Sequence, residues 1–318
     1  MAGVPYRAQN ISIVNAGLGY AKDAQESLYP GLWRNHIGTI APCIMGTSFT
    51  VPEFAHRGDH WNALPPVPLV TSPIGPAFDF NPPAATSRVL KHDSGASDGS
   101  MYKFDAPFTI AFYVNCHTFS GTDLAMFFVS DRRAGSQFFA GIHIFRSTDN
   151  EMALSVGDNT TATMFGEFGM KLWQTANSFI TVDKWTYIVV VVRSFELPDE
   201  AKTVGIDFWQ NGQMENWDDV AQNASSQTMV HANSTRKSNI GWIKKFKPSN
   251  PGAESYSLAL WQCWTRALSD WEVRTLSADP LAMFRRRHRA VGMVPVANRI
   301  VSLGGYYGST GGRAVLIG

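Results

Sequence analysis

The chain has 318 residues, of which 44% are hydrophobic and 17% charged, so it can bury a large core but has a charge-poor surface. Its 27 Lys and Arg residues nearly balance its 26 Asp and Glu residues, and the net charge of +1 provides no long-range attraction to polyanions. Nucleic-acid binding and attachment to an anionic membrane are therefore not expected. A surface this poor in charge is often covered by protein partners.

The sequence shows no targeting or membrane-spanning pattern. Residues 1–20 hold one Arg and lack the continuous apolar stretch of a secretory signal. No run of about 18 apolar residues occurs elsewhere. The three cysteines, Cys43, Cys116 and Cys263, are too few and too scattered for a disulfide framework or for metal-ligand pairs. We expect free buried thiols in a protein made in a cytosol.

Two segments at the start of the chain differ in composition from the rest. Residues 1–25 are small and polar and cannot bury much of themselves, which predicts an N-terminal arm. Residues 26–74 are rich in proline, a residue excluded from the interior of regular central strands. We expect an extended wrap there, held on the surface of the fold by its aromatic side chains.

From Gly75 onward, strand signals recur about every ten residues and are separated by turn residues. Runs of β-branched and aromatic residues predict strands over 75–80, 108–114, 185–192, 204–209 and 238–243. The fourth run leads into Asn211-Gly212, a pair that readily adopts the positive φ angles of a two-residue hairpin turn. This pattern predicts an antiparallel all-β domain.

The stretch Tyr256–Pro280 predicts a buried strand followed at once by a short helix. Strict alternation would place the even-numbered residues from Tyr256 on one face and the odd-numbered ones on the other, and both faces are mostly apolar, as in a strand covered on both sides. Ser269 and Glu272 have the spacing of a capping box. Trp271, Val273 and Leu276 predict an apolar stripe, and the Asp279-Pro280 pair predicts the end of the helix.

This order of features resembles the last strand and closing helix of LamG-like, concanavalin A-type jelly rolls. The residues that carry the resemblance are Trp264, Arg266, Ala267, Leu268, Ser269, Glu272 and Asp279-Pro280, together with the strand that ends at Asn211-Gly212. The resemblance covers residues 75–280. It implies an all-β, two-sheet antiparallel jelly-roll sandwich with extended N- and C-terminal arms.

Residues 281–318 begin with the only dense charge run of the chain and continue as a Gly-rich segment. A basic run after a helix usually lies in solvent or meets an acidic neighbour. We expect a C-terminal arm over 281–318 with strands at Ile300-Val301, at Tyr306-Tyr307 and over 315–317. Its candidate interaction residues are Arg285, Arg286, Arg287, Arg289, Tyr306 and Tyr307.

No pattern in the sequence predicts catalysis. Glycosidases built on this kind of sandwich place paired carboxylates two residues apart on one strand, and no such Glu-x-Asp-x-Glu run occurs. A nucleophile elbow, a His-Glu-x-x-His motif and a phosphate-binding loop are also missing. We expect a protein that is not an enzyme and needs no cofactor.

Two binding hypotheses stay open at this stage. Asp93 and Asp98 cluster oxygen ligands suited to Ca²⁺, although Asp, Ser and Gly are also the residues of any tight turn, which is the favoured interpretation. Trp217 and Trp242 are candidates for stacking on a glycan, although most tryptophans in such a domain belong to the core or to interfaces.

LamG-like domains with an Arg-rich, Gly-rich tail are common in bacteriophage structural proteins, so the resemblance implies a virion protein. The favoured hypothesis is a capsid decoration or cement protein, assembled in the host cytoplasm onto the capsid surface. Its partners would be the major capsid protein and further copies of itself, as a homo-oligomer on the particle. The alternative is a glycan- or receptor-binding module of a phage tail or fibre, because one fold hosts both roles.

Overall fold

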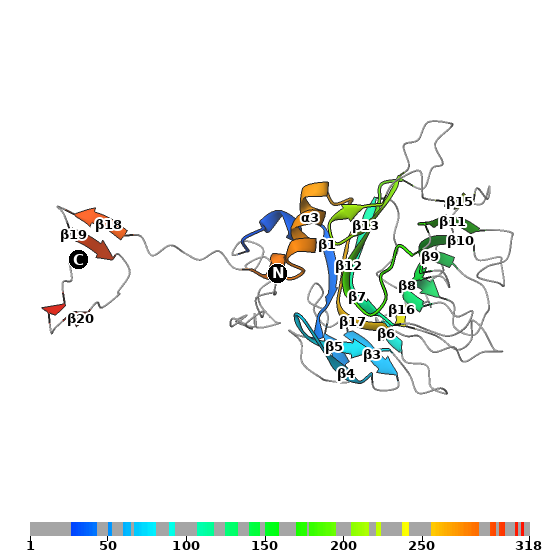
Figure 1. Cartoon of the computed structure of the whole chain (residues 1–318), viewed down its shortest axis with the longest axis horizontal. Coiled ribbons are helices and arrows are strands. Elements are labelled where there is room, and N and C mark those ends of the chain that lie inside the picture. Colours follow the sequence, from blue (N-terminus) through cyan, green and yellow to red (C-terminus); the bar gives the residue numbers. More distant parts are fainter. Residues whose placement is uncertain are drawn as a thin grey trace.

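A computed structural model gives the fold (Figure 1). The structure describes residues 27–42, 50–52, 60–64, 67–80, 89–92, 107–117, 125–132, 140–146, 150–158, 170–176, 178–194, 205–215, 221–223, 237–241, 256–285, 293–296, 299–302, 309–310 and 313–314. Strands dominate this part of the chain, as the sequence predicts.

One antiparallel sheet has eight strands. Its order is β14-β13-β12-β7-β17-β5-β4, and β1 pairs with the far end of β17. The bounds are β1 (His36–Ile40), β4 (Leu69–Ser72), β5 (Gly75–Asp79), β7 (Phe108–Cys116), β12 (Trp185–Val192), β13 (Ile206–Gln210), β14 (Gln213–Met214) and β17 (Tyr256–Trp264).

The other large sheet has nine strands in the order β15-β11-β10-β9-β8-β16-β6-β3-β2. Every pairing within it is antiparallel. Its strands are β2 (Thr50–Pro52), β3 (His60–Leu64), β6 (Val89–His92), β8 (Ala125–Arg132), β9 (Ala140–Arg146), β10 (Met152–Asp158), β11 (Met170–Gln174), β15 (Ala221–Asn223) and β16 (Lys237–Gly241).

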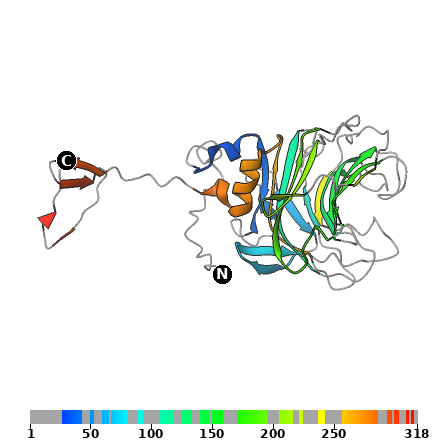
Figure 2. The ribbon, with the colours of Figure 1, turned by 45° about the horizontal axis from the view of Figure 1, so that its top comes forward.

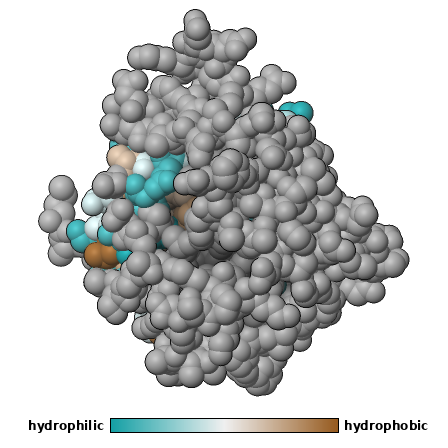
Figure 3. Space-filling model, turned by 90° about the vertical axis from the view of Figure 1, so that its right-hand side faces the viewer, coloured by the Kyte–Doolittle hydropathy of each residue, from teal (hydrophilic) through white to brown (hydrophobic). Residues whose placement is uncertain are grey.

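The two sheets lie face to face, as both ribbon views show (Figures 1 and 2). Their facing side chains form the main hydrophobic core, which includes Ile110, Phe112, Ile144, Leu154, Trp173, Val190 and Phe208. The predicted all-β antiparallel sandwich is therefore confirmed. Viewed from the side of the nine-stranded sheet, the described residues that reach the surface include both hydrophilic and hydrophobic ones (Figure 3).

A second core covers the outer face of the eight-stranded sheet. The short helices η1 (Pro30–Trp33) and η4 (Ala282–Phe284) and the helix α3 (Asp270–Ala278) pack there. Their buried side chains meet alternate residues of the sheet, and the second core includes Leu32, Trp33, Ala111, Val189, Val191, Leu260, Trp264, Val273, Leu276 and Met283. This is why β12 and β17 are apolar on both faces.

A bulge in β17 changes which residues face which core. The pairing of β17 with β7 shifts between Leu258 and Leu260. Tyr256 and Leu258 face the main core before the bulge, whereas Trp261 and Cys263 face it afterwards. The predicted strict alternation along the strand is therefore wrong, because the bulge inserts one residue and exchanges the two faces.

The expected extended wrap over 26–74 needs correction, because strands β1 to β4 lie within that range and belong to the two sheets. The prolines of its described part do not prevent pairing. Pro52 ends β2 at the edge of its sheet, and Pro68 and Pro73 flank the short edge strand β4. Edge positions and strand ends tolerate a missing amide donor.

The C-terminal arm does not begin at 281 as expected. Leu281, Ala282 and Met283 are buried in the second core, with exposed fractions of 3%, 0% and 0%. Leu281 lies directly beyond the proline that ends the helix, and the chain turns back there onto the sheet. The fold therefore extends to Arg285.

Beyond residue 292 the described strands form two small sheets. β18 (Met293–Val296) pairs with β19 (Arg299–Ser302), and β20 (Ser309–Thr310) pairs with β21 (Arg313–Ala314). The predicted strand at Ile300-Val301 is confirmed. The predictions at Tyr306-Tyr307 and 315–317, and the arm over 1–25, lie outside the described residues.

The hairpin turn at Asn211-Gly212 yields a stability prediction. Asn211 and Gly212 have φ angles of 50° and 79°, and a Cβ at Gly212 would lie 3.3 Å from the Cβ of Ser277 on α3. We expect Gly212→Ala to lower the free energy of unfolding by about 1–2 kcal/mol, because a side chain is strained at positive φ.

Urea denaturation of both proteins measures this difference. Gly31→Ala is the matched control, since the nearest atom to its new Cβ would be Glu272 Oε1 at 3.9 Å. The control should change stability by no more than about 0.5 kcal/mol. Equal stabilities for Gly212→Ala and the wild type would contradict the strain argument.

Candidate functional site

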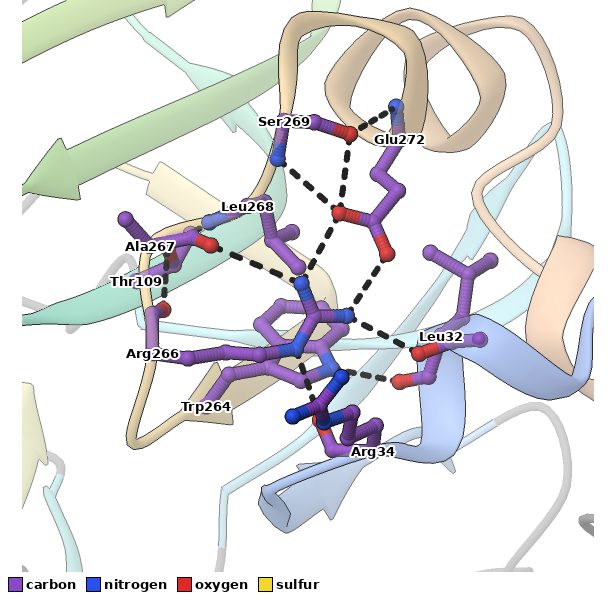
Figure 4. A network of polar contacts seen from close by, with 10 residues as sticks. Leu32, Arg34, Thr109, Trp264, Arg266, Ala267, Leu268, Ser269 and Glu272 are labelled. Atoms are coloured by element: carbon purple, nitrogen blue, oxygen red, sulfur yellow. Dashed lines mark hydrogen bonds and ion pairs between the residues drawn. The ribbon is translucent and has the colours of Figure 1, made fainter.

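The described residues contain three polar arrangements that deserve comparison as sites. The first centres on Arg266 at the end of β17 (Figure 4). Its guanidinium donates to both carboxylate oxygens of Glu272 at 2.7 and 2.8 Å, and also to the main-chain oxygens of Gly31 and Arg34 at 2.9 and 2.8 Å. A bidentate pair of this kind fixes geometry as well as charge. Arg266 therefore joins η1 to α3.

The predicted capping box completes this Arg266 cluster. Glu272 N donates to Ser269 Oγ, while Ser269 N donates to Glu272 Oε2 at 2.9 Å. Trp264 Nε1 also donates to the main-chain oxygen of Leu32 at 2.7 Å. All of these groups are bonded within the chain, so the cluster holds the closing helix in place and offers no free group for chemistry.

The second arrangement lies where the chain enters and leaves the sandwich. Leu28 N donates to the main-chain oxygen of Arg285 at 2.6 Å, and Ser27 Oγ donates to that of Met283 at 2.8 Å. Trp33 Nε1 donates to the same oxygen of Met283 at 2.7 Å. Residues 27 and 285 are thus neighbours in space, and the segments 1–26 and 286–318 both continue from this point.

Exposed apolar side chains lie beside this junction. Trp271 on α3 is 61% exposed and Leu28 is 48% exposed, and the rings of Tyr29 and Trp271 have centroids 6.0 Å apart. We call Leu28, Tyr29 and Trp271 the junction patch. The predicted place of Trp271 in a buried stripe is wrong, because Val273 and Leu276 alone turn toward the sheet and Trp271 points away from it.

The third arrangement crosses the outer face of the eight-stranded sheet. Ser257 on β17 stands opposite Asp79 of β5 on one side and opposite Asn115 of β7 on the other, and Asn115 in turn stands opposite Trp185 of β12. We call Asp79, Ser257, Asn115 and Trp185 the polar–aromatic row. Ser257 is buried, whereas the other three are half-buried.

Aromatic and polar neighbours flank the row. The Tyr113 ring lies 5.4 Å from the Trp185 ring, with an angle of 36° between their planes. His117 Nε2 lies 3.3 Å from Ser257 Oγ, and His117 Nδ1 lies 3.2 Å from Asp183 Oδ1. Side chains from four neighbouring strands therefore meet on one surface.

Ser257, His117 and Asp183 have the connectivity of a catalytic triad, with a base between an alcohol and a carboxylate. Two features of the structure argue against that use. Ser257 is 2% exposed, so a substrate carbonyl cannot approach its hydroxyl. Ser257 also lies within a strand paired on both sides, where the ladder engages the main-chain donors that would form an oxyanion hole.

Cys116 and Arg146 lie beneath this surface. Burial raises the pKa of the Cys116 thiol to about 12, although the adjacent Arg146 cation opposes the shift. Arg146 is 2% exposed and donates to Asn150 Oδ1 and to the main-chain oxygen of His117. Cys116 and Cys263 are buried and form no disulfide, as predicted, whereas Cys43 lies outside the described residues.

Most of the site residues predicted from sequence cannot be compared with the fold. Arg285 is described, and its Nε donates to Asp279 Oδ2 at 2.7 Å, which stabilises the end of α3. The others lie outside the described residues: Asp93, Asp98, Trp217, Trp242, Arg286, Arg287, Arg289, Tyr306 and Tyr307. Among the residues that are described, no three His, Cys, Asp or Glu side chains form a group suited to a metal ion.

Sequence reasoning missed the polar–aromatic row. Tyr113 and Trp185 lie in strands that the sequence predicts, whereas Asn115 lies one residue beyond the predicted strand over 108–114. The register between strands brings Asp79 and Trp185 into the same line. That register depends on contacts far apart in the sequence.

No protein-family profile matches the chain, and no curated protein matches it. Among solved structures, a Trypanosoma rangeli sialidase in complex with 2,3-difluorosialic acid is similar at a TM-score of 0.48 and 11% identity, covering 86% of this chain and 39% of its own. The botulinum neurotoxin type G receptor-binding domain is similar at a TM-score of 0.49 and 11% identity. The match covers 77% of this chain and 51% of that domain.

The chain thus spans about half the length, or less, of these similar proteins. With TM-scores of 0.48 and 0.49 at 11% identity, these likenesses carry no conclusion about this chain, and membership of the LamG-like family stays a prediction. Among the described helices, none is long and apolar enough to cross a membrane.

The Glu272 carboxylate predicts a pH dependence. Burial raises its pKa, but hydrogen bonds from Arg266 and Ser269 and the charge of Arg266 outweigh burial, so the pKa lies below its ordinary value of 4.5. A depressed pKa in the folded state contributes stability above pH 4.5 that is lost as the pH falls through the folded value. We expect Glu272→Gln to lower the free energy of unfolding by about 1.5–3 kcal/mol at pH 7 and by less at pH 3.

Urea denaturation at several pH values between 3 and 7 checks this. Asp270→Asn is the control, since the Asp270 side chain is 64% exposed and 3.8 Å from Arg193; it should cost about 1 kcal/mol at most. A Glu272→Gln deficit that is the same at pH 3 and pH 7 would show that the carboxylate charge contributes nothing.

The buried thiols give a second prediction for this region. In a Cys43→Ser background, a thiol reagent at pH 8 should modify neither Cys116 nor Cys263 in the folded protein, because the Cys116 thiol with a pKa of about 12 stays protonated and both side chains are buried. Both thiols should react once urea unfolds the chain. Rapid labelling of the folded protein would contradict the burial of this core.

Proposed function

We propose that the chain is a non-enzymatic structural subunit whose two flanking segments, 1–26 and 286–318, fasten it to neighbouring proteins. The observation that carries this proposal is the junction at which residues 28 and 285 are hydrogen-bonded to each other. Two segments that start from one fixed point can reach the same neighbour. Contacts made by both together are stronger than contacts made by either alone.

The junction is firmly attached to the sandwich, which a fastening role requires. Gln262 on β17 accepts from Tyr187 Oη at 3.0 Å and donates to Met283 Sδ at 2.8 Å, so η4 is tied to two strands of the sheet. The segment that begins at residue 286 is therefore connected to the sheet through Arg285, Met283 and Gln262. The exposed junction patch beside it adds apolar area for a protein contact.

The triad-like arrangement and the Arg266 cluster both have structural roles, which agrees with a proposed function without catalysis. Ser257 is too buried to act, and the Arg266–Glu272 pair is fully engaged in bonds within the chain. The finer form of the proposal is a bacteriophage head decoration or cement protein on the capsid surface. Its neighbours would be the major capsid protein and further copies of this chain. Support for that finer form comes from the sequence resemblance to LamG-like phage proteins.

A truncation series tests the proposal. We expect deletion of 1–25 or of 286–318 to abolish incorporation into particles, or at least to lower the heat tolerance of particles that contain the protein, because each segment provides contact area. Trp271→Ser should weaken incorporation as well. Quantitative gel analysis of purified particles, before and after heating, measures all three effects.

Val70→Thr is the matched control, since Val70 is also exposed, at 37%, but lies on the edge strand β4. It should leave incorporation unchanged. Deletion of 286–318 preserves Arg285 and its bond to Asp279, so the sandwich should stay folded by circular dichroism. Normal incorporation of both folded truncation variants would overturn the proposal.

A further inference from the structure

We propose that Asn211 is a deamidation site that the hairpin of β13 and β14 protects, so that only copies whose hairpin opens are modified. Asn211-Gly212 is the one Asn-Gly pair in the sequence. It forms the turn between the two strands, where Gln210 stands opposite Gln213. The proposal concerns a modification at the edge of the sheet and does not depend on the structural role proposed above.

The reaction needs only these two residues and water. The main-chain nitrogen of Gly212 attacks Asn211 Cγ and forms a cyclic imide. The Cγ–Nδ2 bond breaks, and the side-chain amide leaves as ammonia with the proton of the Gly212 nitrogen. Water then opens the imide at either carbonyl, which gives Asp or isoaspartate. A glycine after Asn favours the attack, because it has no side chain to shield its nitrogen and its main chain is free to rotate.

The folded turn fixes the Asn211 side chain on β12. Asn211 Oδ1 accepts a hydrogen bond from the main-chain nitrogen of Tyr187 at 2.9 Å, and Asn211 N donates to the main-chain oxygen of Tyr187 at 2.8 Å. Attack by the Gly212 nitrogen requires the side chain to leave this position. The amide of Tyr187 would then lose its acceptor, which costs free energy because Tyr187 is 1% exposed.

The main chain of the turn is fixed as well. Asn211 and Gly212 have φ angles of 50° and 79°, as in the two-residue turns that match the twist of a hairpin. Gly212 is buried against α3, where a Cβ added to it would lie 3.3 Å from the Cβ of Ser277 (Figure 1). Glu215 N donates across the hairpin to the main-chain oxygen of Phe208 at 2.8 Å. The rotation that brings the Gly212 nitrogen to Asn211 Cγ therefore requires the hairpin to open.

The hairpin lies where such opening is easiest. β14 has two residues and stands at one end of the sheet order, and Asn211 is exposed. Edge elements with few buried contacts open locally at a lower free energy than core strands. Water reaches Asn211 in the folded and the open state, so the conformation of the turn decides whether the reaction occurs.

The two products differ in whether the hairpin can close again. Asp at position 211 leaves the main chain unchanged and keeps an oxygen that can accept from the Tyr187 amide. Isoaspartate instead routes the main chain through the side-chain Cβ, which lengthens a turn that already lies against Ser277. We therefore expect isoaspartate to keep the hairpin open, so that a copy modified in this way stays marked.

The experiment follows the full chain at pH 8, folded in buffer and unfolded in urea. Peptide mapping by mass spectrometry quantifies Asn, Asp and isoaspartate at position 211 over time. We expect conversion in the folded protein to be at least about tenfold slower than in urea, because it tracks the open fraction of the hairpin.

Asn150 is an internal control in the same samples. It also has a positive φ, 61°, and its Oδ1 accepts a hydrogen bond from Arg146 Nε at 2.9 Å. The next residue is Glu151, whose side chain hinders attack by its nitrogen. Asn150 should therefore convert slowly in both states.

Two variants at one position assign the protection to the hairpin. Glu215→Pro removes the N–H that donates to Phe208 and should raise conversion of Asn211 in the folded protein by at least about threefold. Glu215→Ala keeps that N–H and is the matched control, which should convert near the wild-type rate. Proteolysis of aged wild-type protein in a urea series should remove copies with isoaspartate before copies with Asn.

Three results would overturn the proposal. Equal conversion of Asn211 in the folded and the unfolded chain would show that the hairpin gives no protection. Conversion in urea no faster than that of Asn150 would remove the site, and a wild-type rate in folded Glu215→Pro would exclude hairpin opening as the route. If that variant does not fold, hydrogen exchange of the Tyr187 amide in the wild type decides the question. Conversion that its open fraction accounts for would support the proposal, and faster conversion would contradict it.

Discussion

The fold depends on β17, a strand of nine residues that is buried along its whole length and on both faces. It pairs with β7 on one side and with β5 and β1 on the other. A strand with two apolar faces needs a cover on each. The opposite sheet covers one face, and η1, α3 and η4 cover the other. The Arg266 cluster holds the second cover in place, because Arg266, just beyond the end of β17, is hydrogen-bonded to both η1 and α3.

Local features of the sequence predicted local features of the structure. The capping box at Ser269 and Glu272 and the turn at Asn211-Gly212 each depend on residues within four positions of one another, so spacing alone identifies them. The long hydrophobic runs likewise located β7, β12 and β17. The exposure of Trp271 was not predictable in this way. It depends on which face of α3 meets the sheet, and the sequence of a nine-residue helix leaves that rotation open.

Features set by distant contacts escaped prediction. The bulge in β17 follows from its pairing with β7, about 150 residues earlier in the chain, as shown by the pairs Leu258 with Val114 and Leu260 with Tyr113. The polar–aromatic row needs the registers of four strands at once. The sequence did not predict the early strands β1 and β3, because prolines are frequent in the segments around them, although neither strand contains a proline. The candidate site is therefore a product of register, which no single segment encodes.

The position of β17 also determines when the protein can fold. The strand is near the end of the described sandwich in sequence but in the middle of a sheet in space, and Trp264 bonds to Leu32 across 232 residues. During synthesis, β1, β5 and β7 emerge long before the strand that joins them. Contacts of such long range form slowly, and until then the apolar edges of those strands are open to other chains. We therefore expect the N-terminal half of the sandwich to expose unpaired strand edges until β17 has left the ribosome.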